Sequence, residues 1–256
     1  MRKIFFAALV VVLVGLTVSS VRPAFASNPP LISPPLRAST LKTALILSSL
    51  EQVFPMGEYG KDMVYYLTHS GYQVTALTNA QVTVDVLLNQ LNNYSLVIWR
   101  TNTYTWKHIE YWYVGQLATS GVETQYASDF AAGFMNANAG ILGVSLNFFS
   151  EHFTSGVLGN VKLMMLISTD SDSIAEFALR AGVTTVIFAN GAISLQFGQT
   201  DDLTTQVLAG LSMGQSVYTA VYGVVSPFVQ NSNPEDPLDT SYSPPFWYQG
   251  DGSLQI

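Results

Sequence analysis

The chain has 256 residues, with 10 basic and 17 acidic side chains and a formal net charge of −7. Its basic residues are scattered, whereas a nucleic-acid-binding surface needs clustered lysines and arginines to displace the counterions of phosphates, so nucleic acid is a poor candidate partner. The chain has no cysteine, which excludes disulfides, thiol nucleophiles and cysteine-ligated metal sites. Stability must then come from a hydrophobic core, and a chain of this size can bury one.

The first 26 residues have the three parts of a secretory signal peptide. Arg2 and Lys3 precede the uncharged apolar run 4–18, and residues 24–26 (Ala-Phe-Ala) supply small side chains at the positions that a signal peptidase recognises. We expect cleavage after Ala26 and a secreted or cell-surface protein, with 7 basic and 17 acidic residues left and a net charge of −10. The alternative is an uncleaved membrane anchor, which is less favoured because the apolar run is about 15 residues and a bilayer span takes about 20. We expect no membrane span in the mature chain.

Residues 27–42 are rich in proline and serine and predict an extended leader. From residue 43 onward, short apolar runs alternate with segments of helical periodicity. Strands are predicted over 43–48, 73–77, 95–99, 141–147, 162–168 and 184–189, and helices over 58–69, 83–91, 149–158, 173–181, 201–209 and 216–223. This alternation predicts an α/β domain over residues 43–223, with a mainly parallel sheet flanked by helices on both faces. Residues 224–256 predict a proline-rich C-terminal tail.

The segment 103–138 is aromatic and polar, with weak periodicity, and predicts a hairpin and loops over the sheet. Its aromatic side chains are either a platform for a sugar or peptide or the packed face of a hairpin, and both interpretations stay open. These side chains are Tyr104, Trp106, Tyr111, Trp112 and Tyr113.

Polar segments follow three of the predicted strands. In an open parallel sheet, ligands gather at the carboxyl ends of the strands. Residues 100–102 follow the strand SLVIW, residues 169–172 follow KLMMLIS, and Asn190 and Gly191 follow TTVIFA. The candidate binding residues are therefore Thr101, Asn102, Asp170, Asp172, Asn190 and Gly191.

The order of three segments resembles the caspase-like cysteine peptidases, of the gingipain and clostripain type. The segments are LTHSGYQVTALTNAQVTVDVLLNQLNNYSLVIW, FTSGVLGNVKLMMLIST and AEFALRAGVTTVIFANGAISLQFGQTDDLTTQVLAGLSMGQSVYTAV. The resemblance covers most of residues 43–223 and rests on the pattern of elements rather than on a sharp motif. It implies a caspase-like fold, with a catalytic His after the strand 96–99 and a catalytic Cys after the strand 163–168. In this chain Asn102 stands at the first position and Asp170 at the second.

The resemblance therefore implies a degenerate, non-catalytic relative, a pseudo-peptidase. An imidazole can hold a proton near neutral pH and an amide cannot, and a carboxylate that attacked a peptide would form a labile anhydride. We expect a binding or structural role outside the cytoplasm, a peptide or protein as the ligand, and no cofactor. The alternative is a hydrolase of another class that uses Asp170 with a divalent metal. The resemblance also predicts that the strands 96–99 and 163–168 are parallel neighbours, with the Cα atoms of Asn102 and Asp170 within roughly 10 Å.

Four aspartates leave two interpretations open. Carboxylate oxygens suit a hard cation such as Ca²⁺ if the fold gathers them. The favoured interpretation is helix capping, with Asp172 before one helix and Asp201 at the start of another. No metal site is assigned to this set, which consists of Asp170, Asp172, Asp201 and Asp202.

Overall fold

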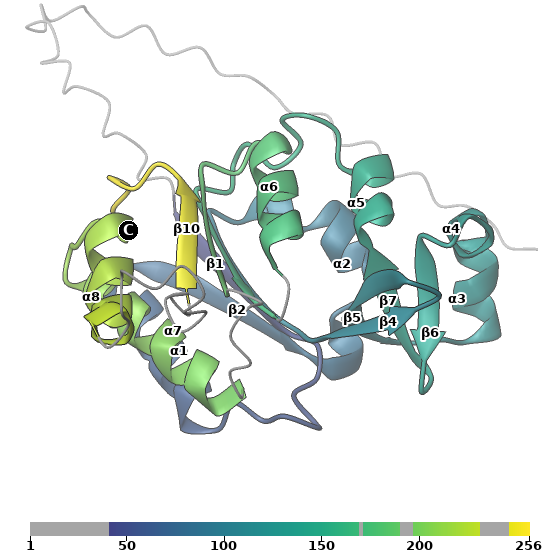
Figure 1. The fold of residues 1–256 in the computed structure, drawn as a ribbon, viewed down its shortest axis with the longest axis horizontal. Coiled ribbons are helices and arrows are strands. Elements are labelled where there is room, and N and C mark those ends of the chain that lie inside the picture. Colours follow the sequence, from purple (N-terminus) through teal and green to yellow (C-terminus); the bar gives the residue numbers. More distant parts are fainter. Residues whose placement is uncertain (1–40, 169–170, 190–196, 231–245) are drawn as a thin grey trace, which may run out of the picture. The chain divides into compact units, whose positions relative to one another are not determined.

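A six-stranded sheet forms the centre of the structure, a computed structural model that describes residues 41–168, 171–189, 197–230 and 246–256. The strand order is β10-β9-β8-β3-β1-β2 (Figure 1). The strands are β1 (Lys42–Ser48), β2 (Tyr72–Thr78), β3 (Leu96–Arg100), β8 (Leu163–Ile167), β9 (Thr185–Ala189) and β10 (Phe246–Gly250). Five of them are parallel, and β10 is antiparallel to β9. The predicted signal peptide, nearly all of the leader and the candidates Asp170, Asn190 and Gly191 lie outside the described residues.

Helices cover both faces of this sheet (Figure 1). One face packs against α1 (Glu58–His69), α7 (Phe197–Ser212) and α8 (Val217–Gln230). The other face packs against α2 (Val84–Asn89), α5 (Leu146–His152) and α6 (Asp172–Arg180). The short 3₁₀ turns η1 (Asn79–Gln81) and η2 (Leu91–Asn93) flank α2. The predicted fold class, α/β with a mainly parallel sheet between two helical layers, is confirmed.

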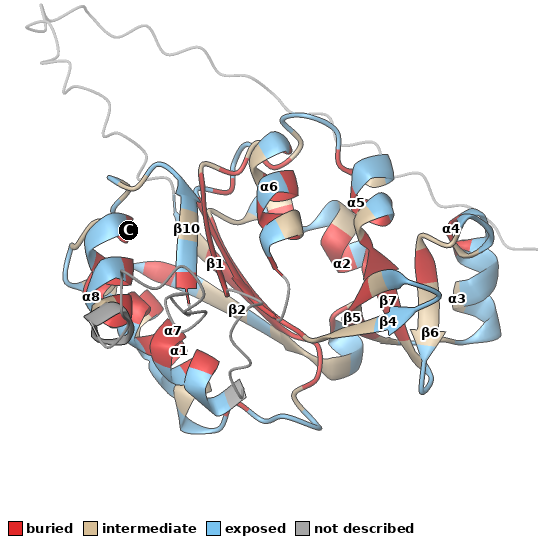
Figure 2. Cartoon of the chain, viewed as in Figure 1, coloured by how far each residue is buried: buried red, intermediate tan, exposed pale blue. Residues whose placement is uncertain are grey.

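The central strands are apolar at consecutive positions because both of their faces are covered. In β3, Val97 and Trp99 join the core on the α2, α5 and α6 side, whereas Leu96 and Ile98 join the core on the α1, α7 and α8 side. All five residues of β3, β8 and β9 are buried (Figure 2). This double burial is what makes the runs LVIWR, LMMLI and TVIFA recognisable as strands in the sequence.

A second, four-stranded antiparallel sheet lies beside the first, with the order β4-β5-β7-β6. Its strands are β4 (Thr103–Trp106), β5 (Ile109–Leu117), β6 (Met135–Asn138) and β7 (Ile141–Ser145), and α3 (Ser120–Gln125) and α4 (Ala127–Ala132) connect β5 to β6. The predicted hairpin is present as β4–β5. The predicted loops of 103–138 are instead strand β6 and two short helices, and the strand predicted over 141–147 belongs to this sheet. The missed elements α3, α4 and β6 have only four to six residues each, which is too short to show a clear periodicity.

The C-terminal part of the chain contributes to the main sheet. The sequence places the end of the domain at Gly223, whereas α8 continues to Gln230 and β10 pairs with β9. Phe246 of β10 is buried against the α1, α7 and α8 layer. A short edge strand that follows a proline-rich stretch carries little of the alternation by which strands are recognised. Among the described residues, no helix combines the length and the apolar character that crossing a bilayer requires.

Candidate functional site

The carboxyl ends of β3 and β8 lie side by side at one edge of the main sheet. The two strands are parallel neighbours, with Leu96 opposite Leu163 and Arg100 opposite Ile167. The backbone N–H of Thr101 donates to the carbonyl of Ile167 at 2.9 Å and continues the pairing by one residue. The predicted neighbour relation of the two strands is confirmed. The predicted distance between Asn102 and Asp170 stays a prediction, because Asp170 is outside the described residues.

The same edge contains the point where the chain reverses direction across the sheet. From β1 the chain passes to β2 on one side, and β3 then pairs with β1 on the other side. In open α/β sheets, the crevice for a ligand lies at the carboxyl ends of the two strands at such a point. Here those ends are Ser48 and Ser49 at the end of β1 and residues 100–102 at the end of β3, so topology and sequence indicate the same place.

Arg100, at the end of β3, forms a buried ion pair with Asp201. Its side chain is 1% exposed, and its Nε and Nη2 donate to the two carboxylate oxygens of Asp201 at 2.7 and 2.8 Å. Its Nη1 donates to the carbonyl oxygen of Phe54 at 2.7 Å. The two-point geometry is the strongest form of an arginine–carboxylate contact. The pair therefore connects the end of β3 to α7 and to the loop after β1.

Glu51, in the loop after β1, places its carboxylate near the guanidinium of Arg100. One carboxylate oxygen of Glu51 accepts from the hydroxyl of Ser48 at 2.8 Å, and the other accepts from the backbone N–H of Met56 at 2.8 Å. The first of these oxygens lies 3.9 Å from Nη1 of Arg100. A second carboxylate therefore lies near the guanidinium of Arg100.

Asp201 neither caps a helix nor serves as a free cation ligand, the two roles that the sequence left open. Because α7 begins at Phe197, Asp201 lies inside the helix and does not cap it. Burial raises the pKa of its carboxyl, and the hydrogen bonds from Arg100 act in the opposite direction. Both oxygens are used by the arginine, so Asp201 is not a free cation ligand. A charged residue at the end of a buried apolar run, as in LVIWR, demands a buried partner, and that signal was available in the sequence.

Asn102 and Thr101 fasten the end of β3 to the second sheet. The side-chain oxygen of Asn102 accepts a hydrogen bond from the backbone N–H of Thr103 at 2.9 Å. The backbone carbonyl oxygen of Asn102 accepts one from the backbone N–H of Tyr113 at 3.0 Å. The hydroxyl of Thr101, a buried residue, donates to the carbonyl oxygen of Tyr113 at 2.6 Å. The amide of Asn102 thus accepts a backbone hydrogen bond where the resemblance would have an imidazole.

All three histidines of the chain lie away from this edge. His69 ends α1, which runs back from β1 to the start of β2, so it lies at the opposite edge of the sheet. His108 is exposed in the turn between β4 and β5. The Nε2 atom of His152, at the end of α5, lies 2.9 Å from the carboxylate of Asp129. No imidazole is therefore available to act as a base beside Asn102.

The acidic residues that are described do not form a cation site. Asp172 is exposed at the first position of α6, and its carboxylate accepts from the backbone N–H of Ser173 at 2.8 Å. Asp202 is exposed on α7 and accepts from Gln206 at 2.9 Å. Within the described ranges, no three His, Asp or Glu side chains are grouped so that they could hold a metal ion. Asp172 is therefore the first residue of α6 rather than the cap before it, which is Ser171, and its negative charge lies in the first turn of the helix.

The aromatic residues of the second sheet are largely packed rather than displayed. Tyr111 and Trp112 are 2% and 1% exposed, and the rings of Tyr104 and Tyr111 stack with centroids 5.4 Å apart. Trp106, at the hairpin end, is 53% exposed. For Tyr111 and Trp112 the structure therefore favours the packed hairpin face over the ligand platform.

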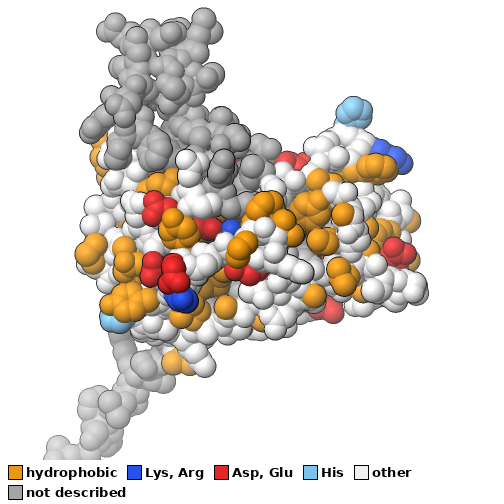
Figure 3. Space-filling model, turned by 90° about the horizontal axis from the view of Figure 1, so that it is seen from below, with side chains coloured by type: hydrophobic (Ala, Val, Ile, Leu, Met, Phe, Trp, Pro, Cys, Tyr) orange, Lys and Arg blue, Asp and Glu red, His pale blue; other side chains and the backbone are white. Residues whose placement is uncertain are grey.

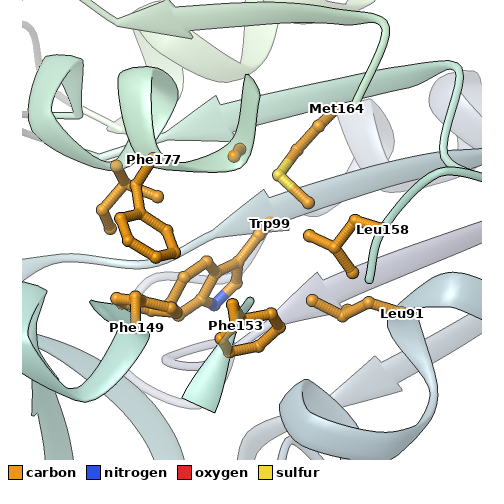
Figure 4. Close-up of a pocket in the computed structure, with 9 residues that line it drawn as sticks. Leu91, Trp99, Phe149, Phe153, Leu158, Met164 and Phe177 are labelled. Atoms are coloured by element: carbon orange, nitrogen blue, oxygen red, sulfur yellow. The ribbon is translucent and has the colours of Figure 1, made fainter. Parts of the chain in front are cut away.

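An apolar cavity lies on the α5 and α6 side of the main sheet (Figure 4). Its volume is about 20 Å³, enough for a single water-sized molecule. The indole N–H of Trp99 donates to the hydroxyl of Ser49 at 3.2 Å, so the indole has its polar partner. The cavity is lined by Leu91, Trp99, Phe149, Phe153, Leu158, Met164, Ile174, Phe177 and Ala178. It is a packing gap in the core and offers no polar group to orient a ligand.

Comparisons with known proteins give little further guidance. No protein-family model matches the chain, and no curated protein matches it. The solved structure of the Drosophila initiator caspase Dronc is similar, with a TM-score of 0.45 and 10% identity, over 84% of this chain and 81% of Dronc. The ADP complex of Bacillus subtilis pyridoxal kinase gives a TM-score of 0.30 and 9% identity, over 78% of this chain and 96% of the kinase. At scores and identities this low, neither likeness says what the chain binds or does.

Proposed function

We propose that this chain is an exported, non-catalytic relative of the caspase-like cysteine peptidases, and that it acts by binding a peptide or protein rather than by cutting one. The observation that carries the proposal is which side chains lie at the carboxyl end of β3. Asn102 is at the position of the family's imidazole, beside the buried pair of Arg100 and Asp201. The chain has no cysteine at all.

The arrangement of strands supports the family part of this proposal. The strands to which the family attaches its two catalytic residues are parallel neighbours here, although 62 residues lie between the end of β3 and the start of β8. The resemblance required this adjacency, which other doubly wound sheets with the parallel strand order 2-1-3-4-5 also have. The two matched positions then follow strand ends on the same edge.

The chemistry of the crevice supports the non-catalytic part. Peptide cleavage by this type of enzyme needs a thiolate to attack the carbonyl carbon and an acid–base group to transfer the proton. The chain has no thiol, and its histidines lie elsewhere. The crevice is stabilised as a structural joint, by an ion pair and by hydrogen bonds to the backbone.

A peptidase assay tests the absence of cleavage. We expect no hydrolysis of a library of fluorogenic peptides that presents every residue type before the scissile bond. The proposal fails if peptides are turned over and the turnover is lost in an Asn102→Ala variant that remains folded.

An introduced thiol tests whether the two matched positions meet. Since the chain has no cysteine, an Asp170→Cys variant carries a single thiol, and its pKa can be measured from the pH dependence of alkylation by iodoacetamide. Adding Asn102→His should lower that pKa and accelerate alkylation at neutral pH by roughly tenfold, because a nearby imidazolium stabilises the thiolate.

The matched control places the thiol on the exposed first residue of α6. An Asp172→Cys variant should alkylate at the same rate with and without Asn102→His, since that side chain faces solvent. Equal rates for the Asp170→Cys variant with and without Asn102→His would show that the two positions are apart, and the family assignment would then be wrong.

Export is tested separately. The charge, apolar run and small residues of positions 1–26 support cleavage after Ala26. The intact mass of protein recovered outside the producing cells should correspond to a chain that begins at Ser27. A mass that includes residues 1–26 would contradict this part of the proposal and leave the rest standing.

A further inference from the structure

Strand β2 is an edge strand whose outer side has no protein partner. It ends the strand order of the main sheet and pairs only with β1, over all seven residues from Tyr72 to Thr78. No backbone–backbone hydrogen bond joins its outer side to any other part of the chain that the structure describes, whereas the N–H of Thr78, its last residue, donates to the side-chain oxygen of Gln81 at 3.1 Å. Its residues are mostly half-buried or exposed, in contrast to the fully buried β3 and β8 (Figure 2). Along the outer side of residues 72–77, backbone donors and acceptors are therefore open to another strand.

The usual protections of an edge strand are missing from β2. Natural sheets block their edges with lysine, proline, a bulge or a very short strand. The sequence YQVTALT has neither a charged residue nor a proline, and its register with β1 is continuous from end to end. The other described edge strands are shorter, with five residues in β10 and four each in β4 and β6. β2 is thus the longest open edge of the two sheets.

The composition around β2 favours a second copy of the same chain. Acidic residues outnumber basic ones, so two copies repel each other wherever charged faces meet (the face in Figure 3 carries several acidic side chains). No charged residue occurs from Ser70 to Val84, so the two β2 strands carry no like charges of their own, and the nearby ammonium of Lys42 lies over the ring of Tyr72 at one end of the strand. A free peptide loses conformational entropy when it becomes a strand, whereas β2 of a second copy is already extended and held by β1.

We propose that two copies of this chain associate through antiparallel pairing of their β2 strands, and so form one continuous sheet of twelve strands. The two-fold axis passes at Thr75, since this register pairs all seven residues: Tyr72 with Thr78, Gln73 with Leu77, and Val74 with Ala76. A two-fold interface is self-complementary, so one uncharged strand serves both sides. Each pair contributes cross-strand contacts and backbone hydrogen bonds.

Charge substitution at the two-fold axis tests the proposal. The purified wild-type chain should change from monomer to dimer as its concentration rises in sedimentation velocity experiments. Thr75→Lys places two like charges directly opposite each other and should raise the dimer Kd by roughly tenfold or more. Thr75→Glu should do the same. An equimolar mixture of these two variants should dimerise again, because the opposing charges then attract.

The control is Thr105→Lys, an exposed threonine on the edge strand β4 of the other sheet, which should leave the Kd unchanged. Hydrogen exchange of the wild-type chain provides a measurement that does not depend on any variant folding, and the amides of residues 72–78 should exchange more slowly in concentrated samples. The proposal is overturned if the wild-type chain stays monomeric at every concentration, if folded Thr75→Lys dimerises as well as wild type, or if exchange in β2 is independent of concentration.

Discussion

The two sheets of this protein bury polar groups in different ways. In the six-stranded sheet, the one fully buried charge, Arg100, is matched by Asp201 and by a backbone carbonyl. In the four-stranded sheet, three buried polar atoms have no hydrogen-bond partner among the described residues, namely the hydroxyl of Tyr104, the indole nitrogen of Trp112 and the hydroxyl of Ser145. The first sheet depends on a satisfied ion pair, and the second depends on close packing of aromatic rings and glycines.

This difference indicates where substitutions should destabilise the fold and where they should not. Removing one partner of a satisfied buried pair leaves an unpaired group in the interior, which costs more than the pair contributes. Removing a polar atom that has no partner releases a group whose burial was already unfavourable. Removing a buried polar group should therefore lower the stability of the fold in the first sheet and should raise it or leave it unchanged in the second, where the group has no partner.

The largest effect is expected from Asp201→Ala. The change leaves the guanidinium of Arg100, which is 1% exposed, without its carboxylate, and should lower the free energy of unfolding by about 3–5 kcal/mol. Urea denaturation followed by circular dichroism measures the loss. The neighbouring exposed Asp202→Ala is the control and should change stability by no more than about 0.5 kcal/mol. Equal effects of the two changes would show that the ion pair is not what holds α7 to β3.

Gly115→Ala should affect the joint between the two sheets. Gly115 lies in β5 with φ +95°, and a Cβ there would lie 2.4 Å from the carbonyl oxygen of Asn79 and 2.9 Å from that of Ser49. Both contacts are with backbone that cannot move aside, so we expect a loss of about 2–4 kcal/mol from strain and overpacking.

The control for this joint is Gly121→Ala in α3, where φ is not positive and only the Thr119 hydroxyl lies near, at 3.9 Å. Alanine favours a helix over glycine, so this change should be neutral or stabilise by about 0.5–1 kcal/mol. A tolerated Gly115→Ala, with an unchanged urea midpoint, would mean that the second sheet does not pack this closely against the loops after β1 and β2.

Removing the hydroxyls of two tyrosines in the second sheet should change stability by smaller amounts and in opposite directions. The hydroxyl of Tyr104 is buried without a partner, so Tyr104→Phe should stabilise the fold or leave it unchanged, by up to about 1 kcal/mol. The hydroxyl of Tyr111 donates to the carbonyl oxygen of Gly133 at 2.8 Å, so Tyr111→Phe should cost about 1 kcal/mol. Thermal unfolding of the two variants measures the difference, and a destabilised Tyr104→Phe would contradict the comparison.

The smallest effect concerns alkaline pH. Burial, with the nearby Asp85 carboxylate, raises the pKa of Tyr126 above its ordinary value of 10.0. Above about pH 10 the unfolded chain loses this proton while the folded chain keeps it, so stability is present below that pH and is lost as pH rises further. Tyr126→Phe should make the decline above pH 10 shallower in urea unfolding at a series of pH values. An identical slope in both proteins would count against the raised pKa.

The contrast between the sheets also explains how much the sequence predicted. The runs in β3, β8 and β9 were recognisable because a strand covered on both faces is apolar at nearly every position, and their alternation with helices gave the α/β class. In the second sheet, β4 and β6 have only four residues each and the register of β5 shifts, so only the first hairpin and strand β7 were predicted. The edge strand β10 was missed because its partner β9 lies far away in the sequence and its own residues show no alternation.

The candidate site divides in the same way. The sequence by itself determined that the chain has no thiol, since this fact needs no coordinates, and it predicts Asn102 and Asp170 at the positions where the resemblance has His and Cys. Only the tertiary structure decided that Asp201, 101 residues after Arg100, is its buried partner, and that Asn102 accepts a hydrogen bond from the backbone N–H of Thr103. Which distant residues meet depends on strand order and helix packing, and local pattern records only the periodicity of each element and not its neighbours.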